Sequence, residues 1–224
     1  MKKCFYIRIT KNACQTVFHL FKNERGFINP HAGPTPYYRS PIDESLAREK
    51  DRNLYPFDFE RSDVITFSFV RNPYDRAVSS WKHSLRENWT TLKFLDYLKR
   101  LPALIPAQSD SLNDNDYAIR RHTMPQYQWL SNQGGEYIVD FIGRVEHLTE
   151  HVRFFGKKMG METFPSSLGR LNSSRPVNDG YVKYYSSEEK KYVEEIYGRD
   201  IHQFGYEFGA PEPSSVCYSR LGGE

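Results

Sequence analysis

The stretch VITFSFVRNPYDRAVSSW, residues 64–81, constrains the fold more than any other part of the chain. Its first seven residues form an apolar, β-branched run that is typical of a buried strand. Asn72 is a good helix N-cap, Pro73 suits the first helical position, and Asp75 suits the positive end of the helix dipole. The stretch therefore predicts a buried strand that turns directly into a helix ending near Arg86.

Strand and helix patterns alternate along the rest of the chain. Strands are expected at 4–9, near Gly26–Ile28, at 64–70 and at 137–145, and helices at 13–21, 73–86, 91–101, 117–130 with a break at Pro125, 147–159, and from Ser186 or Ser187 to about 206. This alternation predicts an α/β fold with a central, mostly parallel sheet flanked by helices. We expect a single domain over 1–224, with an irregular insertion around 26–62, loops at 102–116 and 167–180, and a loop-like tail after residue 208.

Composition limits the classes of function. The 224 residues carry a formal net charge of +3, which is too mild to indicate nucleic-acid binding but is compatible with a basic pocket for an anionic small molecule. The three cysteines, Cys4, Cys14 and Cys217, show no paired metal spacing and fit a reducing compartment. The N-terminus is not a convincing signal peptide, and no apolar run approaches the ~20 residues that a membrane-spanning helix needs. We therefore expect a soluble, cytoplasmic protein without a metal site.

The turn TKNACQT, residues 10–16, carries side chains suited to binding an anion. A helix N-terminus presents free backbone N–H groups and a positive dipole end, so it is a natural phosphate site. Lys11 comes just before the expected helix, and Asn12, Gln15 and Thr16 can add hydrogen bonds. The alternative is an ordinary surface loop with one lysine. The chain has no G-x-x-x-x-G-K-[ST] motif, so a nucleotide triphosphatase P-loop is not supported.

A second turn of this kind follows the strand at 64–70. Arg71 stands at the carboxyl end of that strand, where ligands of open α/β sheets bind. A guanidinium there can hold a phosphate through two parallel hydrogen bonds. Ser79 lies two turns into the following helix and reaches the same phosphate only if the ligand lies along that helix. The alternatives are a structural salt bridge for Arg71 and a packing role for Ser79.

These motifs resemble those of sulfotransferases. FSFVRNPYDRAVSSW is similar to the family's 3′-phosphate-binding motif, including the serine eight residues after the arginine. FYIRITKNACQTVFHLF resembles the family's 5′-phosphosulfate loop. IGRVEHLTEHVRFF, LNSS at 171–174 and YYSSEEKKYVEEIYGRDIHQFGY at 184–206 resemble later segments of Golgi-type carbohydrate sulfotransferases and their bacterial relatives. The order and spacing of the segments agree over most of the chain.

The resemblance implies a P-loop-like, three-layer fold that binds 3′-phosphoadenylyl sulfate (PAPS). The enzyme would move a sulfuryl group to an acceptor hydroxyl or amine, with a carbohydrate hydroxyl as the leading choice, and release adenosine 3′,5′-bisphosphate (PAP) without a metal. Lys11 matches the lysine near the bridging oxygen of the leaving phosphate, and Thr16 matches a 5′-phosphate hydroxyl. Arg71 and Ser79 match the pair that holds the 3′-phosphate. The implied nucleotide contacts also include the rest of the first loop and a loop that closes over the nucleotide in relatives: Asn12, Ala13, Cys14, Gln15, Ser173, Ser174 and Arg175.

The first loop departs from the family pattern. Asn12 replaces a threonine, Cys14 a glycine or serine, and Gln15 a threonine or serine, so that two hydroxyl groups are lost. Asparagine and glutamine can still donate hydrogen bonds, and the helix amides do not depend on side chains. The departures nevertheless support an alternative, a non-catalytic nucleotide-binding or scaffold protein that retains the fold. A kinase of related fold is less favoured because the Walker lysine and serine/threonine pair is missing.

Transfer to a hydroxyl requires a general base, usually histidine or glutamate. His31, in FINPHAG, is favoured because related carbohydrate sulfotransferases carry a catalytic histidine near that position. His122, in RRHTMPQYQWL, is the second candidate because relatives have a similar His-x-x-Pro-Gln segment near the acceptor cleft, and Glu60 is the third. A structural or packing role is the alternative for each. The remaining histidines on expected helices are interpreted as solvated or packing residues: His83, His147, His151 and His202.

Overall fold

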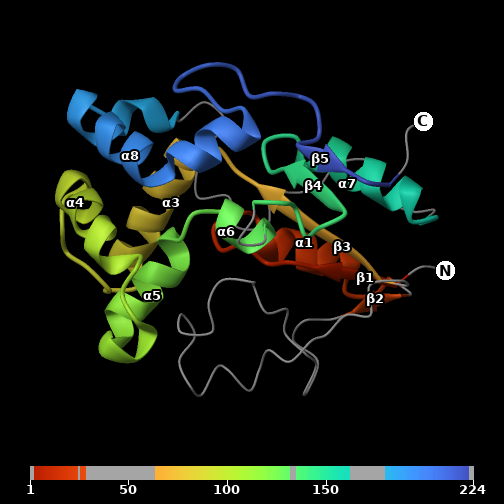
Figure 1. Cartoon of the computed structure of the whole chain (residues 1–224), viewed down its shortest axis with the longest axis horizontal. Coiled ribbons are helices and arrows are strands. Elements are labelled where there is room, and N and C mark those ends of the chain that lie inside the picture. The colour runs from red at the N-terminus through yellow and green to blue at the C-terminus, as the bar shows by residue number, and fades with distance from the viewer. Residues whose placement is uncertain (1–2, 25, 29–63, 132–134, 162–179, 222–224) are drawn as a thin grey trace.

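A computed structural model describes residues 3–24, 26–28, 64–131, 135–161 and 180–221. Its elements, in chain order, are β1 (Lys3–Tyr6), α1 (Cys14–Phe21), β2 (Phe27–Ile28), β3 (Val64–Val70), α3 (Pro73–Arg86), α4 (Phe94–Leu104), η2 (Ser109–Ser111), α5 (Asp114–Thr123), α6 (Tyr127–Leu130), β4 (Phe141–Arg144), α7 (Leu148–Lys158), η3 (Tyr181–Tyr184), α8 (Ser187–Phe204) and β5 (Tyr218–Ser219) (Figure 1). The predicted α/β alternation is confirmed. Most of the expected insertion around 26–62 and most of the loop at 167–180 lie outside the described residues.

The described strands form one sheet in the order β2-β1-β3-β4-β5. The pairs β2–β1, β1–β3 and β3–β4 are parallel, and only β4–β5 is antiparallel. The predicted mostly parallel sheet is confirmed. Because parallel neighbours end at the same edge, the segments that leave β1, β3 and β4 emerge side by side.

Helices cover both faces of the sheet. On one face, side chains of β1, β3 and β4 form a core with α1 and α7: Tyr6, Val17, Phe21, Phe67, Phe69, Phe141, Val152 and Phe155. The rings of Phe67 and Phe155 stack with centroids 4.2 Å apart. On the other face, alternate side chains of the same strands pack against α6 and the end of α8: Phe5, Val70, Leu130, Ile142 and Phe204. The alternation of strand side chains thus produces two apolar faces and three layers.

Beyond the end of β3, helices α3, α4, α5 and α8 pack together into a third apolar cluster (Figure 1). The cluster contains side chains from α3, α4, α5 and α8: Tyr74, Val78, Leu98, Leu101, Ile119, Val193 and Tyr197. Helix α3 belongs to this cluster and also begins directly after β3. It therefore connects the sheet edge to the helical part of the molecule.

Local capping explains where the two longest helices begin. Asn72 accepts a hydrogen bond from the Tyr74 amide at 3.0 Å, so α3 starts at Pro73 as predicted. Ser186 is the N-cap of α8, and Glu189 completes a capping box with it, which resolves the register that the sequence left open. None of the helices in the described part of the chain combines the length and apolar character needed to cross a bilayer.

Several predicted boundaries were wrong. Helix α4 is Phe94–Leu104 rather than 91–101, so Pro102 lies in a helix instead of a loop. Burial of the helix face that bears Leu101 and Leu104 outweighs the local cost of that proline. Helix α5 starts at Asp114, three residues before the predicted start at 117, because Asn113 caps it by accepting a hydrogen bond from the Asp116 backbone amide.

Strands β1 and β4 are shorter than predicted, and the tail is not all loop. Residue Tyr137 forms an isolated bridge with Ser131, so β4 begins only at Phe141. In the tail, Tyr218–Ser219 pairs antiparallel with β4. A strand of two residues has no readable period, and the edge of β4 supplies the pairing that defines it.

Candidate functional site

The two predicted anion-binding turns lie next to each other at the edge where β1 and β3 end. Strand β1 leads into the loop before α1, and β3 leads into α3. Arg71 Nη1 donates a hydrogen bond to the backbone carbonyl of Lys11 at 2.9 Å. Sheet topology therefore brings together two turns that are sixty residues apart in the sequence.

The loop before α1 has an unusual backbone. Lys11 and Ala13 adopt φ values of 67° and 53°, in the left-handed region that L-residues rarely visit. Asn12, between them, is fully buried and its Nδ2 donates to the Phe69 carbonyl at 2.8 Å and to Gln126 Oε1 at 2.7 Å. The amide of Asn12 thus anchors the loop to β3 and to the segment before α6.

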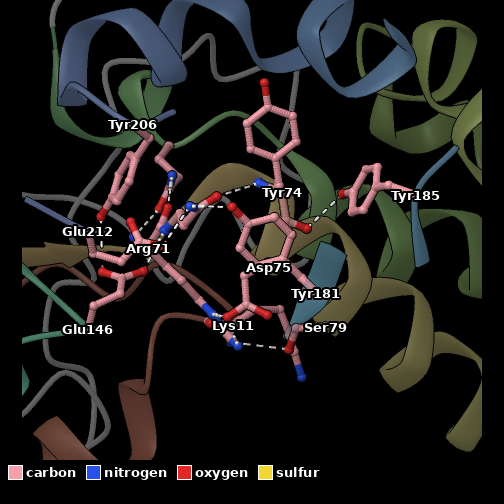
Figure 2. A network of polar contacts seen from close by, with 12 residues as sticks. Lys11, Arg71, Tyr74, Asp75, Ser79, Glu146, Tyr181, Tyr185, Tyr206 and Glu212 are labelled. Atoms are coloured by element: carbon pink, nitrogen blue, oxygen red, sulfur yellow. Dashed lines mark hydrogen bonds and ion pairs between the residues drawn. The ribbon is translucent and has the colours of Figure 1, made fainter. Parts of the chain in front are cut away.

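Three neighbours orient the Arg71 side chain: the Lys11 carbonyl described above, Asp75 and Ser79 (Figure 2). Its Nε and Nη2 donate to Asp75 Oδ2 at 2.8 and 2.6 Å, and its Nη1 donates to Ser79 Oγ at 3.3 Å. The side chain of Arg71 remains 20% exposed, so the guanidinium is fixed but still accessible. Arg71 therefore forms a structural salt bridge with Asp75 and also lies beside Ser79. The sequence had left both interpretations open.

Positive charge is concentrated around Lys11. Burial, followed by the charges of Arg71 and Arg86, lowers the pKa of the Lys11 ammonium to about 8. Arg76, which is buried, donates to the Thr10 carbonyl at 3.3 Å and adds a further cation beneath the loop. Such a cluster of cations strongly favours an anionic ligand, because the ligand removes their mutual repulsion.

His122, the second candidate base, lies near Lys11. Its Nδ1 is 2.7 Å from the Ala118 carbonyl, which can only accept, so Nδ1 carries the proton and Nε2 carries the free electron pair. Burial chiefly, with the charges of His83 and Lys11, lowers the pKa of His122 to about 3. The ring therefore has the tautomer that a general base needs, in surroundings that disfavour its protonated form.

The backbone of His122 is held from α3. Its carbonyl accepts from Ser80 Oγ at 2.7 Å and from Arg76 Nη2 at 3.3 Å. The ring centroids of His83 and Trp89 lie 4.9 and 5.0 Å from that of His122. The sequence pattern predicts a packing or solvated role for His83, and only the tertiary structure places it beside His122.

Acidic residues surround the start of α3 on another side (Figure 2). The backbone amide of Asn72 donates to Glu146 Oε1, and the side-chain Nδ2 of Asn72 donates to Glu212 Oε1, both at 2.7 Å. Tyr206 donates through its hydroxyl to Glu146 Oε2 at 3.1 Å. Burial raises the pKa of Glu146, and burial together with the Glu146 charge raises that of Glu212 to about 7. Sequence reasoning missed this network, whose members come from three separate segments: the start of α3, the segment after β4 and the segment after α8.

Of the other predicted site residues, some lie at the start of α1 and the rest lie outside the described residues. Cys14 is a free thiol that accepts a hydrogen bond from Arg8 Nη2 at 3.6 Å. Thr16 is buried in the first turn of α1, and Gln15 is exposed. The remaining predicted residues lie outside the described residues: His31, Glu60, Ser173, Ser174 and Arg175. In the part of the chain that the structure describes, no three His, Cys, Asp or Glu side chains gather in a way that could hold a metal ion.

Comparison with known proteins identifies the family of the chain. Residues 2–207 match the sulfotransferase family, so the chain belongs to that family. Sulfotransferases of this family are PAPS-dependent transferases, which confirms the predicted enzyme class and sulfuryl donor. Searches of curated proteins and of solved structures gave no match.

Proposed function

We propose that this sulfotransferase moves a sulfuryl group from PAPS to a carbohydrate hydroxyl, with the donor held at its two ends by the two turns. The loop at Lys11 binds the 5′-phosphosulfate, and Arg71 with Ser79 binds the 3′-phosphate. The observation that carries this proposal is the contact between the turns, in which Arg71 Nη1 bonds both the Lys11 carbonyl at 2.9 Å and Ser79 Oγ at 3.3 Å. Two cationic turns in contact suit one ligand with two anionic ends.

The residues of the first loop suit the chemistry of the transfer. As the acceptor oxygen forms its bond to sulfur, the bond from sulfur to the 5′-phosphate oxygen breaks and negative charge grows on the leaving phosphate. Lys11 stabilises that charge electrostatically, and the amides at the start of α1 add fixed partial charges. Positioning of the donor and acceptor supplies the rest of the rate increase.

A general base must take the proton of the acceptor hydroxyl. His31 stays the first candidate and Glu60 the third, both by resemblance. His122 is supported by an observation, because the Ala118 carbonyl fixes its tautomer with Nε2 as the acceptor. Binding of an anionic donor would offset the charge of Lys11, which contributes to the low pKa of His122, and would thereby make His122 a better base.

The acceptor class rests on resemblance to Golgi-type carbohydrate sulfotransferases and their bacterial relatives. On the same basis we propose that Ser173, Ser174 and Arg175 close over the bound nucleotide. The three free thiols, Cys4, Cys14 and Cys217, support placement in a reducing compartment such as the cytoplasm.

The proposal is tested by measuring transfer of labelled sulfate from PAPS to a panel of glycans and small alcohols, alongside equilibrium binding of PAP. We expect PAP binding and transfer to at least one glycan. Binding without transfer to any acceptor would favour the non-catalytic alternative, and absence of PAP binding would overturn the proposed site. His31→Ala, His122→Ala and Glu60→Ala, assayed with the best acceptor, identify the base as the variant that loses turnover but still binds PAP.

A further inference from the structure

Gln126 lies between the two anion-binding turns and is hydrogen-bonded to both. It is fully buried. Its Oε1 accepts from Asn12 Nδ2 at 2.7 Å and from the Arg71 amide at 2.9 Å. Its Nε2 donates to the Arg71 carbonyl at 2.9 Å. One side chain therefore bridges the loop before α1 and the first residue after β3.

The bridge is itself fixed to a third element. The backbone amide of Gln126 donates to Asp200 Oδ2 at 2.7 Å, and the backbone amide of Tyr127 donates to Asp200 Oδ1 at 2.8 Å. Asp200 is fully buried on α8. A buried carboxylate that accepts from two amides is costly to displace, because its partners would lose their hydrogen bonds without gaining water. Gln126 therefore has little freedom to shift.

The loop that Gln126 holds is strained. Lys11 and Ala13 both have positive φ, a conformation that costs ~1–2 kcal/mol per L-residue. Asn12 stands between them, and its bonds to Phe69 and Gln126 hold the loop in this conformation. Without Gln126, the loop keeps its bond to Phe69 but is no longer tied to the Arg71 backbone.

We propose that Gln126 is a positioning residue that fixes the separation of the two turns, so that the 5′ and 3′ ends of one nucleotide are bound cooperatively. This inference rests on the proposed function, in which both turns hold the same donor. A ligand with two phosphates gains from turns that are already correctly spaced, because the second contact then needs no further ordering. A ligand with one phosphate needs only one turn and tolerates a change in their spacing.

The experiment compares the affinities of PAP, adenosine 5′-monophosphate and adenosine 3′-monophosphate for the wild type and for Gln126→Leu, by isothermal titration calorimetry. Leucine has a similar size but makes none of the three side-chain hydrogen bonds. We expect each monophosphate to lose no more than about threefold in affinity and PAP to lose about thirtyfold or more. The matched control is Gln128→Leu, which removes a nearby glutamine that bonds the Tyr127 hydroxyl and should leave the preference for PAP unchanged.

Three outcomes are distinguishable. A selective loss of PAP affinity in Gln126→Leu supports the inference. Equal losses for all three ligands, or no loss for PAP, overturn it while the proposed function stands. If the wild type binds PAP no more tightly than the monophosphates, the proposed function fails and the inference fails with it.

A second variant keeps the test decisive if Gln126→Leu does not fold, as judged by circular dichroism. Gln126→Met removes the same three hydrogen bonds with a flexible side chain of similar length and should show the same selective loss of PAP affinity. Equal losses for PAP and the two monophosphates in Gln126→Met would contradict the positioning role.

Discussion

The charge of Lys11 should control how tightly the donor binds within an accessible pH range. Burial, with the neighbouring charges of Arg71 and Arg86, lowers the pKa of Lys11 to about 8 in the ligand-free protein. A bound phosphosulfate or phosphate favours the ammonium form and raises that pKa again. Affinity for PAP should therefore fall as the pH rises through 8, because binding then requires uptake of a proton.

The size of the effect follows from this pKa. With a pKa of about 8, about nine-tenths of the free protein carries the Lys11 ammonium at pH 7 and about one-tenth at pH 9. Affinity for PAP should therefore fall about tenfold over these two pH units if the ammonium stays protonated in the complex. The phosphates of PAP contribute little, since their last ionisation lies near pH 6.

The assay is calorimetric titration of PAP at half-unit steps from pH 7 to pH 9. Lys11→Arg is the critical control, because a guanidinium stays charged throughout and should give a nearly flat profile. Running the series in Cys14→Ser as well removes any contribution from the thiol of the same loop. If the wild-type profile is as flat as that of Lys11→Arg, Lys11 does not contact the donor in the way proposed here.

Three further predictions concern single side chains. Ser79→Ala should lower the affinity for PAP by about tenfold or less, the value of one hydrogen bond, without changing the affinity for adenosine 5′-monophosphate. Equal losses for both nucleotides would contradict the assignment of Ser79 to the 3′-phosphate. Ala13→Gly should raise the free energy of unfolding by about 1 kcal/mol, since glycine adopts positive φ without strain, and a lower melting temperature would refute this. The pKa of Glu212 is raised to about 7 from its model-peptide value, so its contribution to stability is full in acid and is lost as the pH rises through 7. Glu212→Gln should therefore melt at a higher temperature than the wild type at pH 8 and at a similar temperature at pH 4.5. A lower melting temperature than the wild type at pH 8 would contradict destabilisation by the buried Glu212 charge.

The parts of the fold that could be predicted are those with local causes. The β-branched run at 64–70 predicts β3 from local sequence alone. Asn72 and Pro73 predict the start of α3 in the same way. The capping-box pattern likewise predicts the start of α8 to within one residue, and the structure resolves its register to Ser186 and Glu189. Arg71 could be placed at the sheet edge because it directly follows a strand.

The parts that could not be predicted depend on contacts between distant residues. Asn12 and Gln126 are 114 residues apart, and no local pattern shows that the amide predicted to face a ligand is buried against β3. Strand β5 exists because β4 offers an edge, and Pro102 remains helical because its neighbours are buried. His83 belongs beside His122 for the same kind of reason.

The most direct test of the site compares PAP with adenosine 5′-monophosphate in the wild type and in Arg71→Ala. Charge-assisted hydrogen bonds to the 3′-phosphate should make the wild type prefer PAP by about 100-fold, and Arg71→Ala should reduce that preference to about tenfold or less, the value of the hydrogen bond that Ser79 still offers. The fold should survive, since the Arg71–Asp75 pair is partly exposed and such pairs contribute only ~1 kcal/mol or less to stability. A folded Arg71→Ala variant that keeps the full preference for PAP would contradict the assignment of the 3′-phosphate site.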